Sequence, residues 1–187
     1  MDRIDSAFKA IKREWFVPEE LKARSAVDTP LPIGFGQTIS QPYTVRMMLE
    51  WLQVQPGDKI LDVGSGSGWT SALLGYLTGP SGQVHAVEIV PALVAFGRAN
   101  SRRTGLKNIR FHQAGRRYGL PRLAPYDRIL VSATADEIPA ELTNQLKPGG
   151  KLVIPVKNDI VEAQKQPGGK LETKTHPGFV FVPLIRG

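Results

Sequence analysis

The sequence predicts an α/β protein with a doubly wound, mostly parallel sheet. Short apolar runs of strand length alternate with segments of helical pattern between residues 60 and 156, which is typical of a parallel sheet covered on both faces. Two of these runs end in a carboxylate, at Asp62 and Glu88. Ligands bind at the carboxyl ends of the strands in such sheets, so the pattern also predicts a binding edge. The 187 residues fit a single domain with a buried core.

The N-terminal residues are expected to cover this edge. Four apolar residues at helical spacing predict a helix that ends near Pro18: Ile4, Phe8, Ile11 and Trp15. A Pro- and Gly-rich stretch over 30–42 indicates a loop, and 45–51 is expected to form a second helix. A turn at 56–58 then leads into the first strand of the sheet.

The alternating elements follow in order. The predicted strands are 60–63, 83–88, 108–112, 127–132 and 151–156, and the predicted helices are 69–78, 91–104 and 138–146. After them, residues 167–169 predict a hairpin tip, and the apolar run 179–185 is expected to be an antiparallel strand. The domain therefore divides into a substrate-binding or lid segment (1–55), a cofactor-binding core (56–156) and C-terminal antiparallel strands (157–187).

Composition excludes several classes of protein. The chain has no cysteine, and its three histidines lack metal-ligand spacing, so neither a disulfide framework nor a metal site is expected. The first twenty residues carry many charges and no long apolar run, which favours a cytoplasmic protein without a membrane segment. The net charge is +7, but the basic residues look dispersed apart from the pairs 102–103 and 116–117. A monomer without a nucleic-acid partner is therefore expected.

The stretch 60–69 is the most informative part of the chain. It reads ILDVGSGSGW, so an apolar strand ends at Asp62 and breaks into a glycine turn. The third glycine of a dinucleotide fingerprint would stand where bulky Trp69 is found, which argues against a pyrophosphate cradle. Glu88, twenty residues past Gly68, stands where such folds bind both ribose hydroxyls. These features favour an adenosine ligand without pyrophosphate, best met by S-adenosylmethionine; the alternative is a tight turn followed by an exposed glutamate.

The run over 28–42, DTPLPIGFGQTISQP, is more distinctive still. With it the chain resembles the protein-L-isoaspartate O-methyltransferase family, a family of class I S-adenosylmethionine-dependent methyltransferases. The resemblance continues, in order, through WFVPE at 15–19, ILDVGSGSG at 60–68, APYDRILV at 124–131, LKPGGKLVIPV at 146–156 and FVPL at 181–184. It implies methyl transfer to the free carboxylate of L-isoaspartyl residues in damaged proteins or peptides.

The resemblance also implies roles for individual residues. Ser40 would orient the substrate carboxylate, although a helix-capping role is the alternative reading. The cofactor would be held by Gln37, Thr38, Ser40, Asp62, Gly64, Ser65, Gly66, Gly68, Glu88, Ala114 and Gly115. The peptide substrate would contact Ile33, Gly34, Val182 and Pro183.

One departure from the family pattern concerns the adenine end of the site. The family usually has Gly-Asp-Gly after the third strand, with the aspartate accepting from the adenine amino group, whereas this chain has Ala114-Gly115-Arg116. Losing one hydrogen bond at an exposed rim would cost about 1 kcal/mol. A cofactor-binding relative with reduced or specialised activity therefore stays open. A tRNA methyltransferase also stays open, because the chain is basic and the fold of such enzymes is similar.

Overall fold

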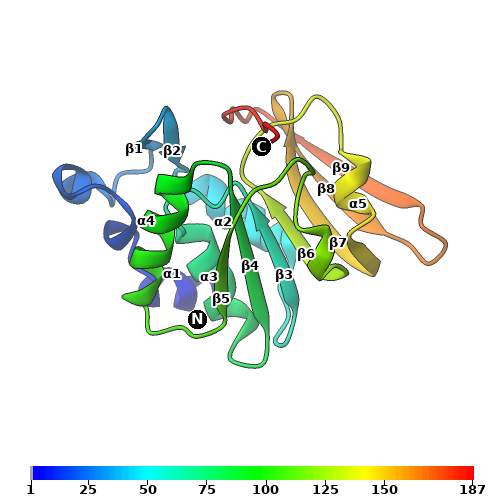
Figure 1. The fold of residues 1–187 in the computed structure, drawn as a ribbon, viewed down its shortest axis with the longest axis horizontal. Helices are drawn as coiled ribbons and strands as arrows, with labels where there is room; N and C mark the ends of the chain where they lie inside the picture. Colours follow the sequence, from blue (N-terminus) through cyan, green and yellow to red (C-terminus); the bar gives the residue numbers. More distant parts are fainter. Residues whose placement is uncertain (1) are drawn as a thin grey trace.

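The computed structural model describes residues 2–187 and contains the predicted α/β architecture (Figure 1). Its main sheet has seven strands in the order β5-β4-β3-β6-β7-β8-β9, parallel from β5 to β7 and antiparallel from β7 to β9. The strands are β3 (Lys59–Val63), β4 (Gln83–Glu88), β5 (Ile109–Gln113), β6 (Tyr126–Val131), β7 (Leu146–Val156), β8 (Asp159–Lys165) and β9 (Leu171–Pro177). β3, which comes first along the chain among the strands of this sheet, thus lies inside the sheet between β4 and β6, as in doubly wound sheets.

Helices cover the two faces of the sheet unequally. The helices are α1 (Arg3–Ala10), α2 (Pro42–Leu52), α3 (Trp69–Thr78), α4 (Pro91–Arg102) and α5 (Ala140–Thr143), with 3₁₀ turns η1 (Arg13–Phe16), η2 (Glu19–Arg24) and η3 (Pro121–Leu123). The first four helices contribute to the apolar layers on one face, whereas short α5, η3 and connecting segments cover the other. None of the helices in the described part of the chain has the length and apolar character that crossing a membrane requires.

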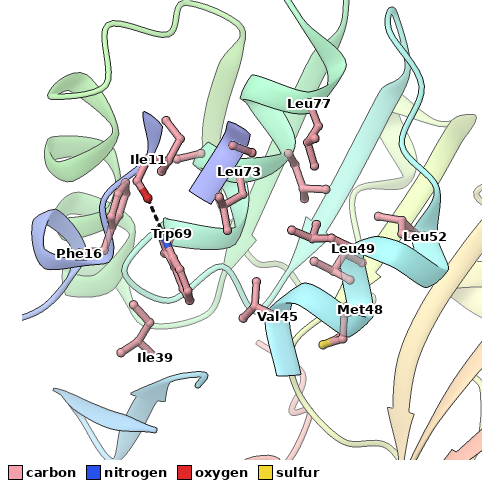
Figure 2. Packing of buried hydrophobic residues seen from close by; sticks show 14 of the residues in the cluster. Ile11, Phe16, Ile39, Val45, Met48, Leu49, Leu52, Trp69, Leu73 and Leu77 are labelled. Atoms are coloured by element: carbon pink, nitrogen blue, oxygen red, sulfur yellow. Dashed lines mark hydrogen bonds between the residues drawn. The ribbon is translucent and has the colours of Figure 1, made fainter. Parts of the chain in front are cut away.

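The N-terminal helix is shorter than the sequence pattern predicts. It ends at Ala10 and is followed by η1 and η2 instead of continuing toward Pro18. A tertiary contact explains the end, because the indole Nε1 of Trp69 donates a hydrogen bond to the carbonyl of Ile11, 3.3 Å away (Figure 2). Ile11, Phe16 and Trp69 are buried together at the start of α3. The predicted apolar stripe therefore packs as expected, in a different local conformation.

Three further expectations were wrong in detail. The predicted helix over 138–146 is the four-residue α5, because Pro139 caps its start and Leu146 already pairs with Tyr126 of β6. The predicted loop over 30–42 contains a hairpin of β1 (Leu31–Gly34) and β2 (Gln37–Ile39). The run 179–185 is not an antiparallel strand; it makes only an isolated parallel bridge between Thr134 and Pro183. The hairpin tip predicted at 167–169 is confirmed between β8 and β9.

Candidate functional site

One cavity lies at the carboxyl ends of β3, β4 and β6, and it is called the main cavity below because most of the predicted site residues line it. Its walls come from six segments: 37–40, 63–70, 87–89, 114–119, 132–133 and 182–185. The β1–β2 hairpin and the C-terminal segment, both at the top of Figure 1, close it from two sides. The C-terminal segment is anchored by backbone hydrogen bonds from Thr134 N to Val182 O and from Leu184 N to Thr134 O, each 2.8 Å long. Segments distant in sequence thus meet at the predicted binding edge.

The glycine turn after β3 forms the floor of this cavity. Gly64, Gly66 and Gly68 all have positive φ angles, of 76°, 50° and 89°, which other residues rarely adopt. A side chain at Gly68 would meet the carbonyl oxygen of Gly97 and the ring of Phe111 at 3.0 Å, so α4 can pack closely against the turn only with glycine here. Gly68 is also the N-cap of α3. Most amides of the turn donate within the protein, those of Gly64 and Ser65 to the Val87 carbonyl and that of Gly68 to the Ser65 carbonyl. A polar ligand would therefore meet the N-terminus of α3, where Trp69 and Thr70 line the cavity.

Glu88 ends β4 beside the turn and is held firmly in place. Its Oε2 accepts a hydrogen bond from the Gly66 amide (2.8 Å), and its Oε1 accepts from the amides of Ile89 (2.7 Å) and Val90 (2.9 Å). The side chain is buried but lines the cavity. A carboxylate has about four acceptor positions, so one remains for a ligand hydroxyl. Glu88 is buried, so the alternative interpretation of a tight turn followed by an exposed glutamate is wrong for this residue.

Asp62 lies beneath the cavity floor instead of lining it. It is fully buried, and its Oδ2 accepts from the hydroxyls of Ser71 (2.6 Å) and Thr70 (2.9 Å). Burial raises the pKa of Asp62 to about 6, against the lowering effect of these hydrogen bonds. Its Oδ1 has no hydrogen-bond partner within residues 2–187, and neither do the buried hydroxyls of Ser65 and Ser67. Unpartnered buried polar atoms at a cavity wall indicate a polar ligand.

Ser40 stands where the main cavity meets a second hollow. This outer groove is lined by residues from 30, 38–44 and 177–182, and it shares Thr38, Ser40, Ser132 and Val182 with the main cavity. The cap of α2 is Gln41, and no side-chain hydrogen bond caps that helix. Ser40 therefore does not cap α2, and its hydroxyl belongs to the boundary between two hollows.

A buried arginine fixes the segment that carries Ser40. The guanidinium of Arg13 donates to five backbone carbonyls, those of Ser25, Val27, Thr29, Ile39 and Ser40, at 2.8–3.4 Å. The residue is 7% exposed, and burial lowers its pKa to about 10, partly offset by the charge of Asp28. The guanidinium also lies over the ring of Trp69, 5.5 Å from its centroid. One side chain thus connects residues 25–40 to the cavity wall.

The structure brings most of the predicted site residues together. The ones that line the main cavity are Gln37, Thr38, Ser40, Gly64, Ser65, Gly66, Glu88, Ala114, Gly115, Val182 and Pro183. Asp62, Gly68, Ile33 and Gly34 are not part of its lining, although the side chain of Ile33 lies 3.1 Å from the position a side chain at Gly66 would take.

Sequence reasoning missed several lining residues. Trp69, Thr70, Arg117, Tyr118 and Ser132 also face the cavity. Ser132 ends a predicted strand, and Trp69 and Thr70 follow the glycine turn, so their positions could have been inferred from that edge. The unusual basic pair 116–117 was a signal for Arg117. Nothing in the local sequence signalled Tyr118, because the loop after β5 folds back over the cavity only through tertiary contacts, including one from the Tyr118 hydroxyl to the Leu184 carbonyl.

Comparison with known proteins gives a consistent set of relatives. The sequence profile of the protein-L-isoaspartate(D-aspartate) O-methyltransferase family matches residues 1–187. Protein-L-isoaspartate O-methyltransferase from Methanopyrus kandleri is 44% identical over 98% of this chain and 84% of its own. The Pyrococcus horikoshii protein of the same name is 42% identical, over 98% of this chain and 85% of its own.

Solved structures of the same kind superpose closely. One structure of a protein-L-isoaspartate O-methyltransferase has a TM-score of 0.89 and 27% identity, and the match covers 98% of this chain and 61% of that one. A Plasmodium falciparum protein assigned to the same family, solved in complex with S-adenosyl-L-homocysteine, also has a TM-score of 0.89, with 26% identity over all of this chain and 92% of its own.

Proposed function

The chain belongs to the protein-L-isoaspartate(D-aspartate) O-methyltransferase family, and from this premise we propose that its main cavity transfers a methyl group from S-adenosylmethionine to the free α-carboxylate of L-isoaspartyl residues in proteins or peptides. The observation that carries the proposal is the position of Ser40 between two hollows. The main cavity suits the methyl donor, and the outer groove suits a peptide. Ser40 lies where the two substrates would meet.

The residues around the main cavity fit S-adenosylmethionine. Glu88 retains an acceptor position beside the glycine turn, which suits a ribose hydroxyl. The unpartnered Ser65 hydroxyl and the N-terminus of α3 suit the polar methionine end, with the buried Asp62 carboxyl beneath. When bound, the cofactor supplies a methyl group on a positively charged sulfur. Ala114, Gly115 and Tyr118 would lie against the adenine end, in place of the family's usual aspartate.

The reaction requires little acid or base catalysis by the protein. An isoaspartyl α-carboxylate has an unperturbed pKa of about 4 and is ionised at neutral pH, so no general base is needed. The Ser40 hydroxyl would donate a hydrogen bond to one carboxylate oxygen and thereby direct the other toward the methyl group. The hairpin and the C-terminal segment would keep water from the nucleophile. Val182 and Pro183 would contact the peptide from the side shared with the outer groove.

The direct test is transfer of radiolabelled methyl from S-adenosylmethionine to two peptides that differ only in isoaspartate versus aspartate. We expect base-labile label on the isoaspartyl peptide alone, because a methyl ester hydrolyses in base. Unfractionated tRNA in a parallel reaction should stay unlabelled. Label on tRNA, or measurable cofactor binding without label on any substrate, would refute the proposal.

A further inference from the structure

The net positive charge of this protein arises from one part of its sequence. Between Glu88 and Asp127 there are eight basic residues and no acidic residue, so this stretch carries +8 while the whole chain carries +7. The eight are Arg98, Arg102, Arg103, Lys107, Arg110, Arg116, Arg117 and Arg122. The rest of the chain is close to neutral. Apparent dispersion along the sequence therefore hides a strongly asymmetric distribution.

The fold gathers these residues around one margin of the sheet, called the basic edge below. They lie on α4, on the turn that follows it, on β5, and on the loop and η3 beyond it. β5 is the outermost strand of the parallel part and pairs only with β4 in the seven-stranded order (Figure 1). All eight side chains are exposed, and within residues 2–187 none of them forms an ion pair with a carboxylate.

Three of these arginines lie around the middle of β5, where they act on His112. Arg122 Nη2 lies 3.3 Å from Nδ1 of His112 on β5, and Arg98 Nη2 donates to the Phe111 carbonyl at 3.2 Å. Burial lowers the pKa of His112, and the charges of Arg122, Arg110 and Arg98 lower it further. Arginines from α4, β5 and η3 thus act together on His112. An anion bound beside them would be attracted by all three charges.

We propose that the basic edge binds the phosphate backbone of a nucleic acid, independently of the proposed methyl transfer. Seven of the eight cations are arginine, whose planar guanidinium suits phosphate oxygens. No large apolar side chain between 89 and 126 is exposed, although Tyr76 of α3 is exposed in a hollow that Lys107 and Arg110 also line. Contacts between arginine and phosphate do not read the bases, so we expect binding that is independent of base sequence. The phosphates of a duplex are evenly spaced, so they can contact cations along the whole basic edge. The carboxylates of an acidic polypeptide would have to be spaced to fit these cations.

The test measures binding of the full chain to a fluorescein-labelled DNA duplex of 20 base pairs and mixed sequence by fluorescence anisotropy. We expect a dissociation constant of about 1 to 100 µM at physiological salt, as for other sequence-independent binding, with the logarithm of affinity falling linearly with the logarithm of salt. The triple variant Arg102→Gln, Arg103→Gln, Arg110→Gln should bind about tenfold more weakly, and its salt slope should be smaller by about 2 to 3.

A charge-matched variant provides the control. Lys9→Gln, Lys12→Gln, Lys170→Gln changes the net charge equally at exposed lysines outside the basic edge, and its affinity should stay within about twofold of the parent. Methyl transfer to the isoaspartyl peptide should be unchanged in both variants, which shows that they are folded. Equal losses in the two variants, no binding at 0.1 M salt, or equally effective competition by polyglutamate at the same charge concentration would each overturn the proposal. The last result would assign the edge to an acidic protein.

Discussion

Ser40 shows how a single hydroxyl gains a role from its position. It borders both the main cavity and the outer groove, on a segment whose backbone is held by Arg13. A serine in this place needs no base, because a positioning hydroxyl only has to donate a hydrogen bond to a group that is already charged. Its contribution should therefore appear in turnover and not in cofactor affinity.

We expect Ser40→Ala to lower kcat on an isoaspartyl peptide about 10- to 100-fold, since a hydrogen bond to a charged group contributes about 1.5–3 kcal/mol. The dissociation constant of S-adenosylmethionine, measured by calorimetry, should change less than twofold. Ser81→Ala, at an exposed serine just before β4, is the matched control and should behave as the parent. A large loss of cofactor affinity with normal turnover at saturation would contradict the role.

Asp62 makes the free energy of unfolding of the protein depend on pH. Its pKa of about 6 in the folded protein lies above the ordinary value of 3.8, because burial penalises the charged form. A carboxyl whose pKa rises on folding destabilises the folded state once it ionises, so its contribution to the free energy of unfolding falls as the pH rises from about 4 to 6.

Asp62→Asn removes this titration while keeping an oxygen that can accept from Ser71 and Thr70. Relative to the parent, the ligand-free variant should become more stable by about 2 kcal/mol when the pH is raised from 4.5 to 7.5. Urea unfolding at the two pH values measures the gain. His85, whose pKa burial lowers to about 4, titrates in the same range in both proteins and cancels in the difference. An equal stability difference at both pH values would show that Asp62 is not the titrating group.

At the scale of elements, the decisive contact is the close approach of α4 to the glycine turn. Gly97 on α4 lies against this turn, and a side chain there would come within 2.8 Å of the Phe111 ring and 3.1 Å of the Gly66 carbonyl oxygen. Glycine on both sides lets the helix and the turn pack backbone to backbone. The position of the turn, and with it the cavity floor, depends on this packing.

Gly97→Ala should therefore destabilise the protein by about 1–3 kcal/mol and weaken cofactor binding, because α4 must move away from the turn. The sign of this stability change is informative, because replacing glycine by alanine in an unobstructed helix stabilises the helix by up to about 1 kcal/mol. Urea unfolding and calorimetry of S-adenosylmethionine binding measure the two effects. A stabilised variant with unchanged affinity would show that the contact carries no strain.

The element scale is also where sequence patterns were least reliable. Alternation correctly located β3, β4, β5 and β6, because a buried parallel strand is a short apolar run bounded by turns. The end of α1, the brevity of α5 and the hairpin in 31–39 were missed. The first two depend on contacts distant in sequence, namely the Trp69 indole at the Ile11 carbonyl and the pairing of Leu146 with Tyr126. The hairpin pairs within its own segment, which the Pro- and Gly-rich composition concealed. Local propensity carries no information about such partners.

For the molecule as a whole, Arg13 connects the N-terminal segment to the core. Its five carbonyl partners lie within residues 25–40, a segment whose residues 37–40 line the main cavity. Lysine has three N–H donors on a single nitrogen and cannot reach all of these acceptors. Losing the guanidinium would leave buried carbonyls without partners and loosen the whole segment.

Arg13→Lys should lower the free energy of unfolding by about 2–4 kcal/mol, since each buried group left unpaired costs about 1–3 kcal/mol. Peptide turnover should fall as well, because Ser40 moves with the segment. Arg128→Lys is the matched control: that arginine is also largely buried, but it pairs with Asp58 far from the cavity. A loss of similar size in both variants would mean that replacing any largely buried arginine by lysine costs this much, and that the five carbonyl contacts of Arg13 have no special role.

The sequence by itself determined the fold class, the family and the binding edge. These depend on features that neighbouring residues carry together: apolar periodicity, a glycine turn after Asp62, and the run over 28–42. Only the tertiary structure decided which predicted residues line the cavity and which, like Asp62, lie beneath it. It also decided that Arg117 and Tyr118 face the cavity and that eight scattered cations share one edge. The reason is physical: periodicity sets the direction of a side chain relative to its own element, whereas burial and contact depend on the elements that pack against it.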